Sequence, residues 1–202
     1  MKKHTAYLLL VFSLLLLSCS KAQEAFFGSS ATSEYSTWPC RFFYDNLMHN
    51  DATLASAINS GSRGVFCQVT QESRGGKQYV QFKNNNGSSS EKPKDVIDVE
   101  NKFIMGLNNG IIIGHQTLNM EPFGGFVGYD IQCPNCVRNE NNTINPNYRV
   151  TMDSKGIATC SKCKKTYDMN NSGIVQNGEE GDTGLARYVA ITDGQHVSVY
   201  RK

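Results

Sequence analysis

The sequence predicts an all-β domain, a small sandwich or barrel that carries a metal-binding subdomain. Short runs of alternating apolar and polar residues recur along the chain, as is typical of half-buried strands. Four cysteines also form two matched pairs, Cys133-Pro-Asn-Cys136 and Cys160-Ser-Lys-Cys163. In each pair the two-residue spacer lets a tight turn direct both sulfurs at one metal ion. Strands with long insertions between them favour a β-sandwich or barrel over any helical fold.

Seven strands are predicted from the pattern. The first is an aromatic run, the next two alternate in hydropathy, and the fourth is the continuous apolar run of a buried strand. The fifth leads into the first cysteine pair, and the last two form a hairpin over Thr192-Asp-Gly-Gln195. Their ranges are 41–44, 65–70, 78–83, 110–115, 126–131, 185–191 and 196–200.

Two segments between these strands are expected to differ from them. Residues 51–59 are the only plausible helix, with Leu54, Ala55 and Ile58 on one side and Asn50 or Asp51 as the cap. Residues 84–93 are rich in Asn, Gly and Ser, which predicts a long polar loop without a core contribution.

The N-terminus predicts export and lipidation. Lys2 and Lys3 precede an apolar run of eleven residues, 7–17, which is too short to span a membrane. The run ends in Leu16-Leu17-Ser18-Cys19, which resembles the lipobox of bacterial lipoproteins. That resemblance implies a signal peptide over residues 1–18, an acylated Cys19 and a lipid anchor in the cell envelope. Because Ser20 rather than Asp follows, the anchor is expected in the outer membrane.

Composition excludes a nucleic-acid partner. Without Lys2 and Lys3 the chain has 18 basic and 18 acidic side chains, so no net field recruits nucleic acid. Residues 19–37 are small and polar and predict a flexible tether, which leaves a single domain over residues 38–202. The expected partners are the membrane, through the lipid, and an envelope protein that the sequence does not identify.

The cysteine pairs are the strongest functional signal. The sulfurs of Cys133, Cys136, Cys160 and Cys163 can form a tetrahedral cage, although the 23 residues between the pairs exceed the usual spacing of zinc ribbons. Three nearby lysines, Lys162, Lys164 and Lys165, either offset the negative charge of such a cage or form an ordinary solvated turn.

From Gly110 onward the chain resembles a Rieske-type domain. The segment from Cys160 to Asp168, Cys-Ser-Lys-Cys-Lys-Lys-Thr-Tyr-Asp, has the frame of the family's second ligand loop, and Gly184 to Ile191 resembles its return strand. The family places a histidine where Cys163 stands. Its first loop keeps Cys133-Pro134, but Cys136 lies one residue later than the histidine would. This pattern resembles Rieske-like lipoproteins of the Bacteroidetes.

The resemblance implies a Rieske-like sandwich or barrel with an inserted, rubredoxin-like or zinc-ribbon-like subdomain over about residues 128–180. It leaves the metal open. Four thiolates suit zinc, which is the first choice because Lys164 and Lys165 stand where the family has small residues. A [2Fe–2S] cluster is the close alternative, of lower potential than a histidine-ligated one, and Tyr167 would then tune it.

Two alternatives need no metal. In an oxidising envelope the four cysteines could form disulfides within or across the pairs, and Cys40 and Cys67 are candidates for a further disulfide or for two buried free thiols. Cys133 with Cys136 could also be a thioredoxin-type redox pair. That chemistry needs a helix after the first cysteine, and residues 137–143 do not favour one.

No catalytic motif is present in the sequence. His49, His115 and His196 are isolated, and no Ser/His/Asp set, carboxylate pair or phosphate loop is found. The chain is therefore not expected to be an enzyme by itself. Its function is expected to be structural metal binding, electron transfer or, as a disulfide-stapled module, the binding of another molecule.

Overall fold

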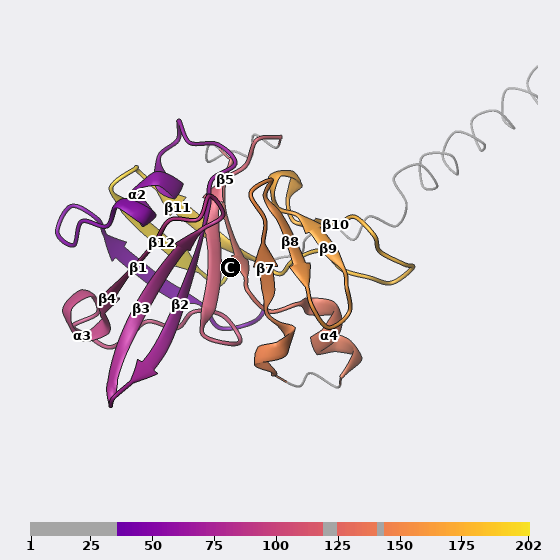
Figure 1. Ribbon diagram of the computed structural model, residues 1–202, viewed down its shortest axis with the longest axis horizontal. Helices are drawn as coiled ribbons and strands as arrows, with labels where there is room; N and C mark the ends of the chain where they lie inside the picture. The colour runs from indigo at the N-terminus through magenta and orange to yellow at the C-terminus, as the bar shows by residue number, and fades with distance from the viewer. Residues whose placement is uncertain (1–35, 119–124, 141–143) are drawn as a thin grey trace, which may run out of the picture. The chain divides into compact units, whose positions relative to one another are not determined.

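The computed structural model describes residues 36–118, 125–140 and 144–202 (Figure 1). The predicted signal peptide, the predicted lipidation site Cys19 and the predicted tether up to residue 35 lie outside these ranges. The described residues are mostly β-strand, as the sequence predicts.

Eight strands form one large antiparallel sheet. Their order is β1, β12, β11, β6, β5, β2, β3, β4, so the first and last strands of the chain are neighbours. All seven strands expected from the sequence are found in this sheet. The bounds are β1 Arg41–Asp45, β2 Phe66–Arg74, β3 Lys77–Asn84, β4 Ser89–Pro93, β5 Gly110–His115, β6 Phe126–Asp130, β11 Arg187–Thr192 and β12 His196–Tyr200.

The prediction of a loop over residues 84–93 holds for residues 85–88 and is wrong for residue 84 and residues 89–93. Ser89–Pro93 is the edge strand β4, which pairs with β3 from Lys83↔Ser89 to Tyr79↔Pro93. The strand escapes the hydropathy pattern because its side chains are all exposed or half-buried. A polar edge strand of this kind also protects a sheet from pairing with other chains.

The predicted helix is confirmed, but it is not the only one. Helix α2 covers Ala52–Ile58, and the Asp51 side chain caps it by accepting a hydrogen bond from the backbone N–H of Leu54. Two further short helices follow, α3 over Lys94–Ile97 and α4 over Pro134–Asn139. Helix α4 contradicts the expectation that no helix follows Cys133. Its six residues are too few to show an amphipathic period, so the sequence pattern gives no sign of it.

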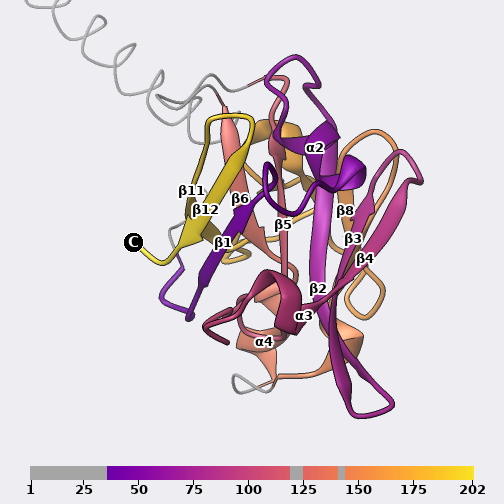
Figure 2. The same ribbon diagram turned by 90° about the vertical axis from the view of Figure 1, so that its left-hand side faces the viewer.

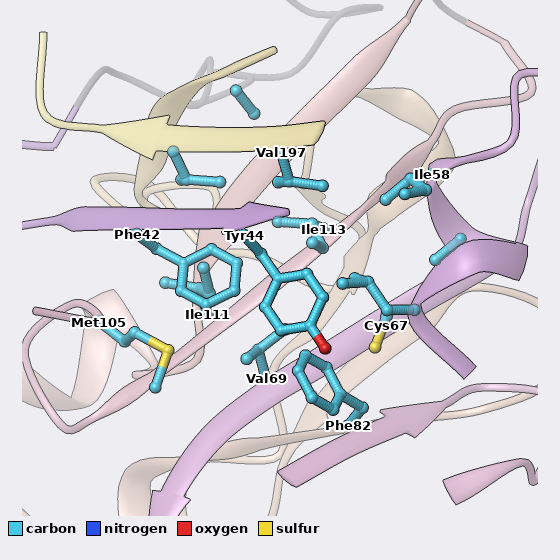
Figure 3. Packing of buried hydrophobic residues seen from close by; sticks show 14 of the residues in the cluster. Phe42, Tyr44, Ile58, Cys67, Val69, Phe82, Met105, Ile111, Ile113 and Val197 are labelled. Atoms are coloured by element: carbon cyan, nitrogen blue, oxygen red, sulfur yellow. The ribbon is translucent and has the colours of Figure 1, made fainter. Parts of the chain in front are cut away.

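The large sheet curls around a first hydrophobic core. Tyr44 of β1 and Phe82 of β3 are far apart in the strand order, yet their rings meet edge to face at 5.3 Å (Figure 3). Ile111 and Ile113 of β5 point into the same core. Helices α2 and α3 lie at opposite ends of the curled sheet (Figure 2).

A second, four-stranded sheet packs beside the first. It is inserted between β6 and β11, which pair directly through Arg187↔Tyr129, and its order is β10, β9, β8, β7. The middle isoleucine of β5, Ile112, faces a second core that the small sheet completes. Strand β5 is therefore buried on both faces, which explains its uninterrupted apolar run. The bounds are β7 Val150–Met152, β8 Ile157–Cys160, β9 Thr166–Asp168 and β10 Ile174–Val175.

Candidate metal centre

The four cysteines of the two pairs meet at the end of the small sheet. Their four sulfur atoms all lie within 4.8 Å of one another. Cys133 Sγ is 3.6 Å from Cys163 Sγ, and Cys136 Sγ is 3.6 Å from Cys160 Sγ. The predicted ligands are thus brought together and positioned to hold one metal ion. We call residues 133–136 the first knuckle and residues 160–163 the second.

The first knuckle is the start of helix α4. Cys133 is the N-cap residue and Pro134 the first helical residue, where a missing N–H costs nothing. The helical turn places Cys136 one turn after Cys133, so both sulfurs lie on the same side. The carbonyl of Cys133 accepts from Val137 N at 3.2 Å, and its own N–H donates to the Tyr148 carbonyl at 2.8 Å. These bonds fix the backbone of the knuckle from both sides.

The second knuckle is the turn that joins β8 to β9. Cys160 ends β8, its N–H donates to the Lys165 carbonyl at 3.0 Å, and its carbonyl accepts from Lys164 N at 2.9 Å. Lys164 has a φ of +61°, the left-handed conformation that closes such a tight turn. The turn leaves Cys163 partly exposed, whereas the other three ligands are buried.

A chain of hydrogen bonds ends on the sulfur of Cys133. The buried Asn135 amide pairs with the backbone of Thr183: its Oδ1 accepts from Thr183 N and its Nδ2 donates to Thr183 O, each at 2.9 Å. This pairing fixes the amide orientation, so Nδ2 is also the donor to Tyr167 Oη at 3.0 Å. The Tyr167 hydroxyl accepts that bond and can donate its own proton to Cys133 Sγ, 3.0 Å away. A sulfur that accepts in this way is suited to be a thiolate.

Residues 176–183 cross both knuckles, and we call this segment the strap. Asp182 carries an ion pair with Lys165 of the β8–β9 turn at 2.6 Å and a longer one with Arg138 of α4 at 3.5 Å. Asn177 accepts from Thr166 N and donates to the Lys164 carbonyl. The strap thus ties the two knuckles to each other through charge and hydrogen bonds.

The three lysines of the second turn have different environments. The Lys165 ammonium pairs with the Asp182 carboxylate. Its positive charge is therefore balanced by this carboxylate and not by the thiolates alone. The Lys165 pKa is raised by the same Asp182 contact. Lys162 and Lys164 are exposed to solvent. Two of the three lysines therefore fit the interpretation of an ordinary solvated turn, which was one of the two alternatives from the sequence.

The thiols influence one another's ionisation. The neighbouring Cys160 sulfur, followed by burial, raises the Cys133 pKa well above its ordinary range. The Cys160 pKa is lowered to about 5 because the Cys133 thiol donates a hydrogen bond to it. Burial, followed by the sulfurs of Cys163 and Cys160, raises the Cys136 pKa to about 12. Without a metal the cluster thus favours one thiolate held by its neighbours, and a bound cation would displace the remaining protons.

The donor set and its dimensions fit a single tetrahedral ion. Four thiolates at about 2.3 Å from a zinc-sized ion form a tetrahedron with edges of about 3.8 Å. Two sulfur–sulfur distances are 3.6 Å and none exceeds 4.8 Å, so only small movements would complete such a cage.

The remaining two candidate cysteines do not form a disulfide. Cys40 and Cys67 are buried free thiols in the first core, which is the other outcome that the sequence allowed. Burial raises the pKa of Cys40 to about 12. Both thiols act as small apolar side chains and lie outside the metal centre.

Sequence reasoning missed the residues that support the ligands. Asn135 lies inside the first spacer, but an asparagine there carries no signal of its own. Thr183 contacts Asn135, which is 48 residues away in the sequence. Asp182 contacts Arg138, which is 44 residues away. Only the proximity of Tyr167 to the second knuckle was visible beforehand.

Comparisons with known proteins do not assign the chain to a family, since no family model, no curated protein and no solved structure matches it. Within the described ranges, every helix is too short or too polar to cross a bilayer.

Proposed function

We propose that this chain is a lipid-anchored protein of the bacterial cell envelope whose small sheet is held together by one zinc ion on Cys133, Cys136, Cys160 and Cys163. The observation that carries the proposal is the compactness of the four sulfurs, all within 4.8 Å of one another. One ion needs about this spacing, whereas a two-iron core would push the two thiolate pairs to more than about 5 Å apart.

The surroundings of the site support a structural role. The second core packs the buried cysteines against apolar side chains of the segments around the knuckles, among them Val137, Tyr148 and Met169. Binding of an ion by four thiolates would therefore contribute directly to folding of the small sheet. The ion would neutralise the thiolates, while Tyr167 donates to Cys133 and the strap fixes the two knuckles.

The proposed envelope location rests on the lipobox-like Leu16-Leu17-Ser18-Cys19, with the outer membrane favoured by Ser20. The Rieske-like assignment is likewise part of this proposal. It is supported by the insertion of both knuckles between two paired strands of the large sheet, and by Tyr167 next to a ligand sulfur. In this setting the domain would serve as a binding module held at the membrane for another envelope protein.

A second candidate function is electron transfer by an iron–sulfur centre. Two observations favour it: the hydroxyl of Tyr167 donates to a ligand sulfur, and the ligand Cys163 reaches the surface. The first would tune a potential, and the second would give electrons a short path to a partner.

Metal analysis with absorbance spectroscopy separates the candidates. The protein should be purified both aerobically and anaerobically, without added metal. A colourless protein with one zinc per chain supports the proposed function. A brown protein with two irons and two sulfides, or a red one with a single iron, refutes it in favour of electron transfer.

A further inference from the structure

All four sulfurs lie within 4.8 Å of one another, and two of their contacts join the two knuckles. Cys133 of the first knuckle lies 3.6 Å from Cys163 of the second, and Cys136 of the first lies 3.6 Å from Cys160 of the second. Four cysteines allow three disulfide pairings. In the pairing of Cys133 with Cys163 and Cys136 with Cys160, the two sulfurs of each bond start only 3.6 Å apart.

The four sulfurs also differ in access. Cys133 and Cys160 are 0% exposed and Cys136 is 4% exposed, whereas Cys163 is partly exposed. The exposed ammonium groups of Lys162 and Lys164 flank Cys163 in sequence. A thiolate that is accessible and near positive charge is the one that an oxidant attacks first. An external oxidant therefore meets this centre at Cys163.

We infer that Cys163 is an oxidation site through which a peroxide converts the metal centre into cross-knuckle disulfides, Cys133–Cys163 first and Cys136–Cys160 second. This inference rests on the proposed zinc site and deepens it, since it names the class of molecule that acts on the centre. The envelope, where disulfides persist, is the compartment in which such a conversion would be stable.

The chemistry balances with hydrogen peroxide as the oxidant. The Cys163 thiolate attacks one peroxide oxygen, an S–O bond forms, the O–O bond breaks, and hydroxide leaves. The Cys133 thiolate then attacks the Cys163 sulfur, the S–S bond forms, and a second hydroxide leaves. Two thiolates have lost two electrons and one peroxide has gained them. The thiolates of Cys136 and Cys160 are too few for a closed zinc site, so oxidation releases the ion.

The pairing determines whether the change can be reversed. A bond between knuckles keeps the loops together, as the metal does, and the strap contacts of Asp182 do not involve sulfur. Reduction of the disulfides would then restore a site whose four sulfurs are already close. Bonds within each knuckle would leave the two loops without a covalent link to each other.

The test begins with the zinc content of the full chain, purified under reducing conditions. One equivalent of hydrogen peroxide is then added, zinc release is followed with a chromogenic chelator, free thiols are alkylated, and tryptic peptides are mapped without reduction. Cleavage after Lys162 separates Cys160 from Cys163. Fragmentation between Cys133 and Cys136 identifies which of them carries the bond. Cys40 and Cys67 are internal controls that should stay reduced because they are buried.

The expected result is release of zinc together with a Cys133–Cys163 bond, followed by Cys136–Cys160 at a second equivalent. Cys163→His keeps a Cys₃His site and should slow the release at least about tenfold, whereas Cys136→His changes a buried ligand and should not. Bonds within the knuckles would overturn the inference, and so would the pairing of Cys133 with Cys160 and Cys136 with Cys163. Peroxide that leaves zinc bound would also overturn it.

The wild-type peptide map decides the question even where a variant does not fold. A preparation without zinc would refute the proposed function alone, because the same map of the metal-free chain still shows whether Cys163 reacts first and with Cys133.

Discussion

Tyr167→Phe isolates the hydrogen bond to the ligand sulfur. The substitution removes only the hydroxyl, which lies 3.0 Å from Cys133 Sγ and accepts from Asn135 Nδ2 at the same distance. The ring stays in the second core, where Tyr167 is fully buried. Burial also raises the Tyr167 pKa, so the hydroxyl stays protonated and able to donate.

The expected loss has two parts. A hydrogen bond to a charged acceptor contributes about 1.5–3 kcal/mol, so zinc affinity should fall by about 10- to 100-fold. The Asn135 amide keeps its bond to the Thr183 carbonyl but loses its second acceptor. That unpaired N–H should lower the free energy of unfolding by about 1–3 kcal/mol in the metal-free and metal-bound forms alike.

The assay is a competition between the protein and a chromophoric chelator for zinc, with unfolding by urea measured separately. Tyr188→Phe is the matched control. Its hydroxyl also donates to a buried acceptor, Asp130 Oδ2 at 2.6 Å, but on strand β11 and away from the sulfurs. The control should lose stability and keep its zinc affinity. A Tyr167→Phe affinity within twofold of the wild type would refute the assigned hydrogen bond.

Three further predictions concern the strap and the packing around the buried Asp130. Asp182→Asn should lower zinc affinity by about tenfold in the same competition assay, because it removes the negative charge that pairs with Lys165. Gly106→Ala should destabilise the fold by several kcal/mol in urea unfolding, because its new Cβ would collide with Asp130. Burial raises the Asp130 pKa to about 6, so the folded state holds a proton that the unfolded state has already lost. The contribution of Asp130 to the free energy of unfolding is thus greatest below pH 4 and falls by about 3 kcal/mol as the pH rises through 6. Asp130→Asn should abolish this pH dependence when unfolding curves of the variant and the wild type are compared.

Each of these has an outcome that contradicts it. An unchanged zinc affinity in Asp182→Asn would mean that the strap does not hold the knuckles. Gly75→Ala is the control for Gly106→Ala, since Gly75 also has a positive φ but no atom near its Cβ position. If both variants lost the same free energy of unfolding, the collision of the new Cβ with Asp130 could not be the cause. If the wild type and Asp130→Asn show the same dependence on pH, Asp130 does not titrate near 6.

The sequence predicted the four ligands because their spacing is a local property. A two-residue spacer encodes a turn whatever the rest of the chain does, so Cys133 and Cys136 could be assigned as a pair without knowing the fold. The predicted strands were similarly local, because burial on one or both faces leaves a hydropathy pattern. Strand β4 left no such pattern, since an exposed edge strand is defined by its pairing with β3.

The supports of the site could not be predicted for a different reason. Asn135, Tyr167 and Thr183 come from three separate segments, and their hydrogen bonds span 32 to 48 residues. A polar residue that pairs over such a distance looks like any surface residue in the sequence. Which sulfur stays accessible is also a tertiary property, because the turn at Lys164 and the packing of the second core together decide it.

Helix α4 changes the reason for excluding a thioredoxin-type redox pair at Cys133. The sequence excluded it because no helix was expected there, and yet Cys133 is the N-cap of one. The neighbouring Cys160 sulfur and burial nevertheless raise the Cys133 pKa, so the short helix does not activate the thiol. Its sulfur is also 0% exposed and receives the Tyr167 hydroxyl. A catalytic dithiol needs an accessible, acidic first cysteine, whereas a metal ligand needs a fixed sulfur. Because α4 holds Cys133 and Cys136 toward the second knuckle, the helix favours the ligand role.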